Sequence, residues 1–267
     1  MRLLAVAMIQ PYRTKQKNDQ NDAAARCEAV SRPRTRFVPV KSEGQQAVLT
    51  GQRARELRVS ERTALANQIR GVVMEYGIVG APGLQRLRRA LPEVLARVES
   101  LPTLGREVVD ALRARWLELE PRIGEYDQRL QRLAKQTAAT RRLMQGEGVG
   151  PIRATAVVAT IGHGQAFEHG RQFVAWLGLV PKPHSPGGKT GLGGITKQGN
   201  VYVRTLLMHG ARAVLEFSAK RPDRKSRWVE AVRRRRGHNI AAVALAAKHA
   251  RILWARLARR EEDQLAV

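Results

Sequence analysis

The chain of 267 residues has a single cysteine, Cys27, and few aromatic side chains. One cysteine excludes an internal disulfide, and the six histidines are scattered without the spacing of a zinc site. An aromatic content of 4% disfavours a stacking surface for single-stranded nucleic acid. The longest apolar run, residues 240–247, is too short to cross a bilayer. These absences favour a cytoplasmic protein.

A short apolar stretch lies near the amino terminus, at residues 3–9. It follows one arginine and is followed at once by a proline and basic residues. It therefore resembles the hydrophobic part of a secretion signal only superficially. We interpret it as a β-strand.

Acidic residues are scarce: 23 Asp and Glu stand against 48 Lys and Arg, a formal net charge of +25. The excess is largest in residues 139–267, which hold 23 basic and 8 acidic side chains. Because a polyanion compensates such self-repulsion, the composition favours a nucleic-acid partner. The alternative is a cationic surface that only keeps the protein in solution.

The middle of the chain carries a heptad pattern, in which apolar residues recur at alternating steps of four and three. They are Leu112, Trp116, Leu119, Ile123, Tyr126, Leu130 and Leu133. This spacing predicts a coiled coil, with a kink or a break at Pro121 and Gly124. An earlier helix is expected over residues 45–76. The two helices form either an antiparallel hairpin within one chain or an arm for dimerisation, and the sequence leaves both open.

A glycine-rich turn at residues 146–151 precedes an apolar helix at 152–161, and a second helix is expected at 165–177. Two short helices entered through G-V-G resemble a helix-hairpin-helix. In that motif, backbone N–H groups near Gly148 and Gly150 would hold a phosphate. The alternative is a glycine turn that serves only tight packing.

Residues 177–200 form a loop rich in glycine and lysine, which we expect to approach phosphate closely. A helix capped by Asn200 follows, and a last helix is expected at 240–259 after a cap at Asn239. An arginine run precedes that last helix. Such runs are commonly solvent-exposed helix faces, but an arginine run close to a loop rich in glycine and lysine favours a phosphate-binding groove. The predicted nucleic-acid contacts are Gly148, Gly150, Lys182, Gly187, Gly188, Lys189, Lys197, Arg204, Arg233, Arg234, Arg235 and Arg236.

Two patterns could carry chemistry. Ser185 is the only hydroxyl residue among residues 177–189, and a serine nucleophile requires a basic surrounding that neutralises the phosphate. A turn serine beside a proline is the alternative. Asp19 and Asp22, three residues apart, would share one helix face and could bind Mg²⁺. In the alternative interpretation, Asp19 or Asn18 caps a helix, and aspartates are simply favoured in its first turn.

Several segments between residues 143 and 212 carry a family resemblance: G-V-G-P, F-V-A-W-L-G-L-V-P, S-P-G-G-K, G-G-I-T-K-Q-G-N and V-R-T-L-L-M-H-G-A-R-A. They closely resemble the carboxyl-terminal domain of the bacterial insertion-sequence transposases of family one hundred and ten (with one hundred and sixteen and nine hundred and two). Upstream, K-N-D-Q-N-D-A and R-P-R-T-R-F-V-P-V-K resemble the end of that family's amino-terminal domain.

The resemblance implies a RuvC-like domain whose four acidic residues bind Mg²⁺, a coiled-coil linker, and a carboxyl-terminal domain with a nucleophilic serine. It also implies a recombinase that is guided by an element-encoded bridge RNA and assembles as dimers and tetramers. Asp19 and Asp22 match the third and fourth acids, and Ser185 is the nearest match to the serine. The first two acids have no counterpart here, and Pro186 stands where the family serine usually lies, so we expect an amino-terminally truncated copy.

The sequence thus predicts a mostly α-helical protein in three parts: a remnant of the RuvC-like α/β domain at 1–40, a coiled-coil helical hairpin at 41–138, and a basic domain with a helix-hairpin-helix at 139–267. The predicted function is a transposase that binds DNA and a guide RNA and exchanges DNA strands, with an incomplete Mg²⁺ site. The alternatives are a non-catalytic nucleic-acid-binding remnant that oligomerises through its coiled coil, and a coiled-coil scaffold.

Overall fold

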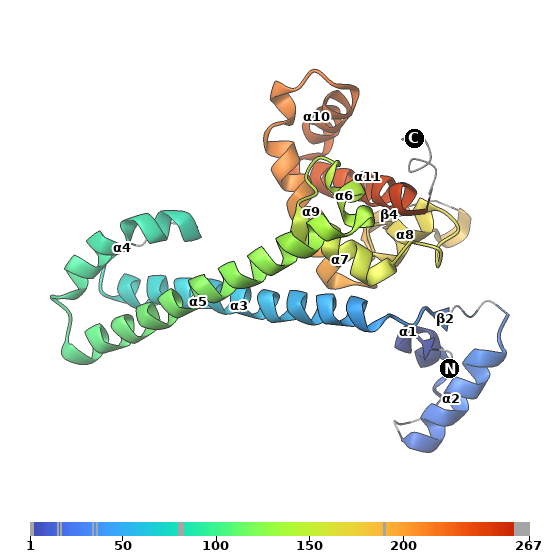
Figure 1. The fold of residues 1–267 in the computed structure, drawn as a ribbon, viewed down its shortest axis with the longest axis horizontal. Helices are drawn as coiled ribbons and strands as arrows, with labels where there is room; N and C mark the ends of the chain where they lie inside the picture. Colours follow the sequence, from blue (N-terminus) through green and yellow to red (C-terminus); the bar gives the residue numbers. More distant parts are fainter. Residues whose placement is uncertain are drawn as a thin grey trace.

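The computed structural model describes residues 3–14, 16, 18–33, 35, 37–79, 83–188 and 191–258. Most of them lie in helices, and the strands form two small two-stranded sheets, so the predicted mostly α-helical class is confirmed (Figure 1). Two long helices run side by side away from a cluster of shorter helices near the carboxyl terminus (Figure 1). Among the described residues, no helix is both long enough and apolar enough to cross a membrane.

The amino-terminal segment is a small unit of its own. Strand β1 (Leu3–Leu4) pairs antiparallel with β2 (Phe37–Val38), and between them lie α1 (Val6–Ile9), the 3₁₀ helix η1 (Gln10–Tyr12) and α2 (Asp19–Ser31). The predicted strand at residues 3–9 is therefore wrong beyond Leu4. Because β2 offers only two residues for pairing, the backbone groups that follow find partners within a helical turn instead.

The long arm consists of α3 (Glu43–Glu75), α4 (Leu84–Val98) and α5 (Thr103–Gln136). A capping box starts α3, because Ser42 and Gln45 bond each other's backbone N–H groups. Ion pairs join Arg55 to Asp127, and Arg62 to Glu120 at 3.4 Å, so the later residue of α3 pairs with the earlier residue of α5 and the two helices run antiparallel. Of the two arrangements that the sequence left open, the structure thus shows the hairpin within one chain.

The heptad pattern of α5 faces α3 and α4. Trp116, Leu119, Ile123 and Leu130 are buried, whereas Leu133 at the end of the seam is 39% exposed. The predicted break at Pro121 is wrong, because α5 continues through it. Pro121 is itself exposed, and burial of the apolar residues on both sides offsets the roughly 3 kcal/mol that a proline costs inside a helix. Helix α4, which completes the arm, was not predicted.

The carboxyl-terminal body contains α6 (Ala138–Met144), α7 (Pro151–Ile161), α8 (Gly170–Trp176), α9 (Val201–Glu216), the 3₁₀ helix η3 (Ser218–Lys220), α10 (Arg224–Arg236) and α11 (His238–Ala258). Helices α7, α9 and α11 supply most of its core, and the largest side chains buried there are Phe173, Leu143, Leu177, Leu207, Leu215, Leu245, Leu253 and Leu257. This core packs against α3 and α5 through α7.

Two helix starts of the body differ from the prediction, and helix α10 was not predicted. Helix α8 begins only at Gly170, because His169 takes the N-cap position and its Nδ1 accepts a hydrogen bond from the Gln172 N–H at 3.2 Å. Helix α11 begins at His238, so Asn239 lies inside it rather than at its cap. The basic stretch before it forms α10, in which Asp223 accepts hydrogen bonds from the first-turn N–H groups. The predicted helices at 152–161 and from Asn200 are confirmed.

Candidate functional site

The glycine-rich segment forms an exposed β-hairpin that projects from the body. Strand β3 (Pro181–His184) pairs antiparallel with β4 (Gly191–Ile195), and the 3₁₀ turn η2 (Pro186–Gly188) follows β3. Ser185 lies between β3 and η2, and its side chain is exposed to solvent. The hairpin therefore presents Ser185 near its tip, where an extended ligand could reach the hydroxyl.

Close backbone contacts fix the base of this hairpin. The Thr196 N–H donates to the Val180 carbonyl at 2.9 Å, and the Lys197 N–H donates to the Gly178 carbonyl at 3.1 Å. Gly178 adopts a positive φ of 69°, and a Cβ there would lie 2.2 Å from the Gln198 carbonyl oxygen. Only glycine fits at this position, so Gly178 is required for the end of α8 to lie against the base of the hairpin.

The chain leaves the hairpin through a second tight contact. Gly199 has a φ of 83°, and a Cβ there would lie 1.7 Å from the Trp176 carbonyl oxygen. Asn200 then caps α9 by accepting from the Val203 N–H at 2.9 Å. Arg204 donates to the carbonyls of Leu177, at 2.8 Å, and Gln198, at 3.0 Å. The base of the hairpin is thus held by α8 on one side and α9 on the other.

The predicted phosphate contacts of the hairpin fall into two groups. The side chains of Lys182 and Lys197 are exposed, and Gly187 adopts a φ of 57° in the turn after Ser185, with Gly188 next to it. These residues lie on the same projection as Ser185. Arg204 is half-buried and bonded to carbonyls, so its guanidinium helps to hold the hairpin in place. Lys189 lies outside the described residues.

The predicted helix-hairpin-helix turn packs tightly against α9. Gly148 has a φ of 69°, and a Cβ there would lie 2.8 Å from the Gly210 carbonyl oxygen. Arg153 donates to the carbonyls of Gly148, at 2.6 Å, and Leu206, at 2.8 Å. The packing alternative thus accounts for Gly148. Gly150 is the N-cap of α7 and has open space around its Cα, so phosphate binding there stays a prediction.

The arginine run Arg233, Arg234, Arg235 and Arg236 forms the last turn of α10. Arg233 is half-buried and pairs with Glu230 at 3.4 Å, whereas the next three are exposed. Cations are favourable at a helix carboxyl terminus, so part of this run is explained by the helix itself. The exposed arginines remain available for a polyanion.

The predicted acidic pair lies in the first turn of α2. Asn18 caps this helix by accepting from the Asn21 N–H at 2.7 Å, and Asp22 lies 3.9 Å from Arg13. Asp19 and Asp22 thus occupy the positions that a helix dipole favours. Within the described residues, no group of three or more His, Cys, Asp and Glu side chains could hold a metal ion. Helix α2 makes its main contacts with α1 and η1, and it lies apart from the hairpin (Figure 1).

One concave feature was missed by reasoning from the sequence. A pocket lies between the 146–151 turn, α10 and α11, and its lining includes Glu147, Lys225 and His249. These residues are separated by up to about a hundred positions, so no spacing pattern connects them.

The chain is similar to known transposases over most of its length. The model of the family described as "Transposase IS116/IS110/IS902 family" matches residues 140–228, which include the hairpin and Ser185. A "Probable family 20 transposase" of Pseudomonas aeruginosa is 45% identical over 265 residues, covering 97% of this chain and 77% of the relative. The "Transposase for insertion sequence element IS1111A" of Coxiella burnetii is 42% identical over 260 residues, covering 97% and 71%.

A third relative, the "Transposase for insertion sequence element IS1328" of Yersinia enterocolitica, is 34% identical over 254 residues, covering 95% of this chain and 75% of the relative. Because these similarities extend through the amino-terminal unit, the arm and the body alike, they concern the chain as a whole. The chain belongs to the IS116/IS110/IS902 family of insertion-sequence transposases.

Proposed function

We propose that this transposase binds DNA together with a guide RNA and exchanges DNA strands, with Ser185 as the nucleophile. The observation that carries the proposal is the exposed position of Ser185 near the tip of a hairpin with a fixed base. A nucleophile must reach a phosphate inside a bulky double helix. A projection with an exposed hydroxyl, an exposed Lys182 and a base fixed by backbone hydrogen bonds meets that requirement.

The proposed step is a transesterification. The Ser185 Oγ attacks phosphorus, its proton passes to solvent, and the bond from phosphorus to one sugar oxygen breaks. The departing sugar hydroxyl takes up a proton, and the strand stays attached to the protein as a phosphodiester of Ser185. Attack by another strand's hydroxyl reverses the step, so no bond energy is lost between cleavage and joining. The exposed Lys182, three residues before the serine, would help to neutralise the negative charge on the phosphate oxygens.

Mg²⁺ remains a proposal that rests on Asp19 and Asp22 alone. Two carboxylates in one helix turn, one of them near Arg13, supply fewer ligands than a two-metal site needs. Within the described residues the set therefore does not fit a complete site, and the serine step above does not depend on it. Asp19 and Asp22 would at most supply part of a site completed by other groups.

The separation between the acidic pair and Ser185 within one chain suggests an oligomer. Because α2 lies apart from the hairpin in one chain, Ser185 and the acidic pair could act on one phosphate only if a second copy supplied one of them or the amino-terminal unit moved. We therefore propose a homo-oligomer, with the arm as its contact. This would explain why several apolar side chains at the far end of the arm are exposed: Met74 at 64%, Val79 at 82% and Leu104 at 72%.

Reconstitution tests the catalytic proposal. The purified chain is incubated with the DNA ends of its element, the guide RNA and Mg²⁺, and recombinant junctions are counted by sequencing. Ser185→Ala should abolish junctions and leave DNA affinity unchanged, whereas Ser60→Ala, an exposed serine of α3, should change neither. Junctions that persist in Ser185→Ala would exclude the serine as the nucleophile.

The second candidate function is a non-catalytic nucleic-acid-binding protein that assembles with catalytically complete transposases of its family. The incomplete acidic set favours it. It predicts strong, salt-dependent binding without junctions: the logarithm of the affinity should fall linearly with the logarithm of the salt concentration. Intact binding of the wild-type chain with no junctions under any Mg²⁺ concentration would support this second function over the first.

A further inference from the structure

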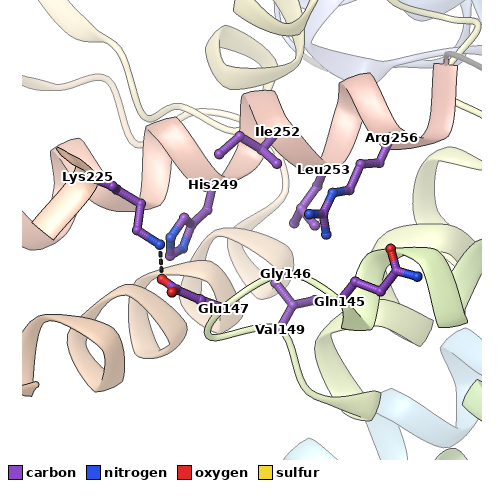
Figure 2. Close-up of a pocket in the computed structure, with 9 residues that line it drawn as sticks. All are labelled: Gln145, Gly146, Glu147, Val149, Lys225, His249, Ile252, Leu253 and Arg256. Atoms are coloured by element: carbon purple, nitrogen blue, oxygen red, sulfur yellow. Dashed lines mark hydrogen bonds and ion pairs between the residues drawn. The ribbon is translucent and has the colours of Figure 1, made fainter. Parts of the chain in front are cut away.

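A pocket of about 230 Å³ opens between the 146–151 turn, α10 and α11 (Figure 2). Gln145, Gly146, Glu147 and Val149 form one wall, Lys225 lies at one end, and α11 supplies the opposite wall with His249, Ile252, Leu253 and Arg256. Drug-sized ligands occupy about 300 to 1,000 Å³. This pocket is smaller and suits a single flat ring system.

The polar end of the pocket is built around the carboxylate of Glu147. Arg221 donates to its Oε1 at 2.9 Å, and Lys225 pairs with its Oε2. These two cations fix the orientation of the carboxylate without using all of its acceptor sites, since a carboxylate can accept about four hydrogen bonds. Glu147 can therefore still accept from an amino group of a ligand.

His249 adds an unpaired nitrogen at the same end. Its side chain is 5% exposed, and its Nε2 has no hydrogen-bond partner among the described residues. Burial, with Lys225, Arg153 and Lys248 nearby, lowers the pKa of His249 to about 4. The imidazole is therefore neutral at physiological pH, and one ring nitrogen can donate while the other accepts. A buried polar atom without a partner is unfavourable, and a ligand with a polar edge would supply the missing hydrogen bond.

The rest of the lining offers surfaces against which a ring can stack. Val149, Ile252 and Leu253 contribute aliphatic surface, and Arg256 contributes a planar guanidinium that donates to the Arg142 carbonyl at 3.3 Å. Guanidinium planes and aliphatic side chains stack against ring faces. The pocket thus combines ring-stacking surfaces with a polar end that both donates and accepts, inside a strongly cationic protein.

We infer that this pocket binds one unpaired base of a bound nucleic acid, with its ring against Ile252, Leu253 and Arg256 of α11 and its polar edge toward Glu147 and His249. The base carries an amino group, because the free acceptor sites of Glu147 require a donor. The inference rests on the proposed nucleic-acid binding and deepens it: the protein would recognise a bulged or flipped nucleotide beside the strand whose backbone it holds.

The test compares three fluorescent duplexes that share one sequence: a fully paired duplex, one with a single bulged adenosine, and one with a bulged abasic site. A bulge also bends DNA, and the abasic duplex keeps that flexibility while removing the base. We expect the wild-type chain to bind the adenosine bulge on the order of tenfold more tightly than the abasic bulge, the size of a stacked base's contribution. Equal affinities for the two bulges would overturn the inference.

A matched pair of variants locates the effect. Ile252 is 38% exposed at the pocket, and Ile252→Trp should fill it; Ile240, 53% exposed on the same helix, lies outside it. Ile252→Trp should lose the tenfold preference and keep its affinity for the paired duplex, whereas Ile240→Trp should keep both. An unchanged preference in Ile252→Trp, with its fold verified by circular dichroism, would exclude this pocket.

The paired duplex separates the inference from the function on which it rests. Normal affinity for the paired duplex with no preference for the adenosine bulge would reject only the base pocket. If the wild-type chain binds none of the three duplexes and none of their RNA versions, both nucleic-acid binding and the proposed base pocket are rejected. A preference confined to the RNA versions would support the pocket and identify the guide as the strand that carries the base.

Discussion

The hydroxyl of Tyr202 donates a 2.5 Å hydrogen bond to the Oε1 of Gln52, which joins the first turn of α9 to arm helix α3. The amide nitrogen of the same glutamine donates to the Ile152 carbonyl at 3.0 Å and to the Thr155 hydroxyl at 2.8 Å. Gln52 is completely buried, so a single amide group connects the arm to two helices of the body.

Replacing this glutamine should destabilise the protein markedly. Gln52→Leu would remove the acceptor of the half-buried Tyr202 hydroxyl and the donor to the Ile152 carbonyl, and we expect a loss of about 2–3 kcal/mol in the free energy of unfolding. Tyr202→Phe should cost about 1 kcal/mol. Because both variants remove the same bond, the double variant should cost less than the sum of the two, as measured by urea denaturation. Gln46→Leu, at an exposed position of α3, is the control and should stay within about 0.5 kcal/mol.

The contact between Gly148 and Gly210 leads to a second prediction. A Cβ at Gly210 would lie 2.6 Å from the Gly148 carbonyl oxygen and 3.0 Å from the Arg153 Nε. Gly210→Ala should therefore force α9 away from the 146–151 turn and cost about 1–3 kcal/mol. A Cβ at Gly124 of α5 would meet no neighbouring group of the described residues within 4 Å, so Gly124→Ala should instead stabilise by up to about 1 kcal/mol. Equal thermal denaturation midpoints for the two variants would contradict this account of the turn.

The base of the hairpin provides a third prediction, on activity. Gly199→Ala would bring a Cβ against the Trp176 carbonyl at a positive φ, so we expect the hairpin to lose its fixed orientation and strand exchange to fall at least about tenfold. Gly194→Ala, in β4 with open space around it, should leave strand exchange nearly unchanged. The two rates are compared in the junction assay, and limited proteolysis of the hairpin should become faster in Gly199→Ala alone.

His249 predicts a pH dependence of stability. Its folded pKa of about 4 lies below the unfolded value near 6.5, so the unfolded chain binds a proton first as the pH falls. The free energy of unfolding should therefore decrease between pH 6.5 and 4, by about 3 kcal/mol from this group. His249→Gln should flatten the curve over this window, whereas His163→Gln, an exposed histidine, should not. Parallel curves for the wild type and His249→Gln would show that the imidazole does not carry the effect.

The helices that were predicted correctly are those whose sequence patterns are local. Asn200 caps α9 as predicted, and the heptad residues of α5 identify the buried face of the arm. The start of α3 was predicted near residue 45, but its capping box with Ser42 was not. The continuity of α5 through Pro121 could not be predicted, because it depends on packing against α3 and α4. The same holds for α8, whose start is set by the side chain of His169.

The candidate site was predicted in composition but not in geometry. The glycines and lysines near Ser185 were identified, yet the strands were missed, because Pro181 and Pro183 disfavour a strand and β4 is mostly glycine. The hairpin exists because Gly178 and Gly199 fit against backbone from distant positions. The role of Gly148 was equally hard to predict. It packs against α9, whose residues lie more than fifty positions later in the sequence, and this contact explains the glycine without a phosphate.

The attachment of the arm beside the start of α9 has a mechanical consequence. Gln52 lies near one end of α3, and the other end, at Glu75, is roughly 35 Å away at 1.5 Å per residue. A tilt of α3 by a few degrees about Gln52 moves that far end by several ångströms but shifts Tyr202 only slightly. A partner that displaces the far end of α3 would therefore shift the start of α9, which follows the base of the hairpin, over a much smaller distance.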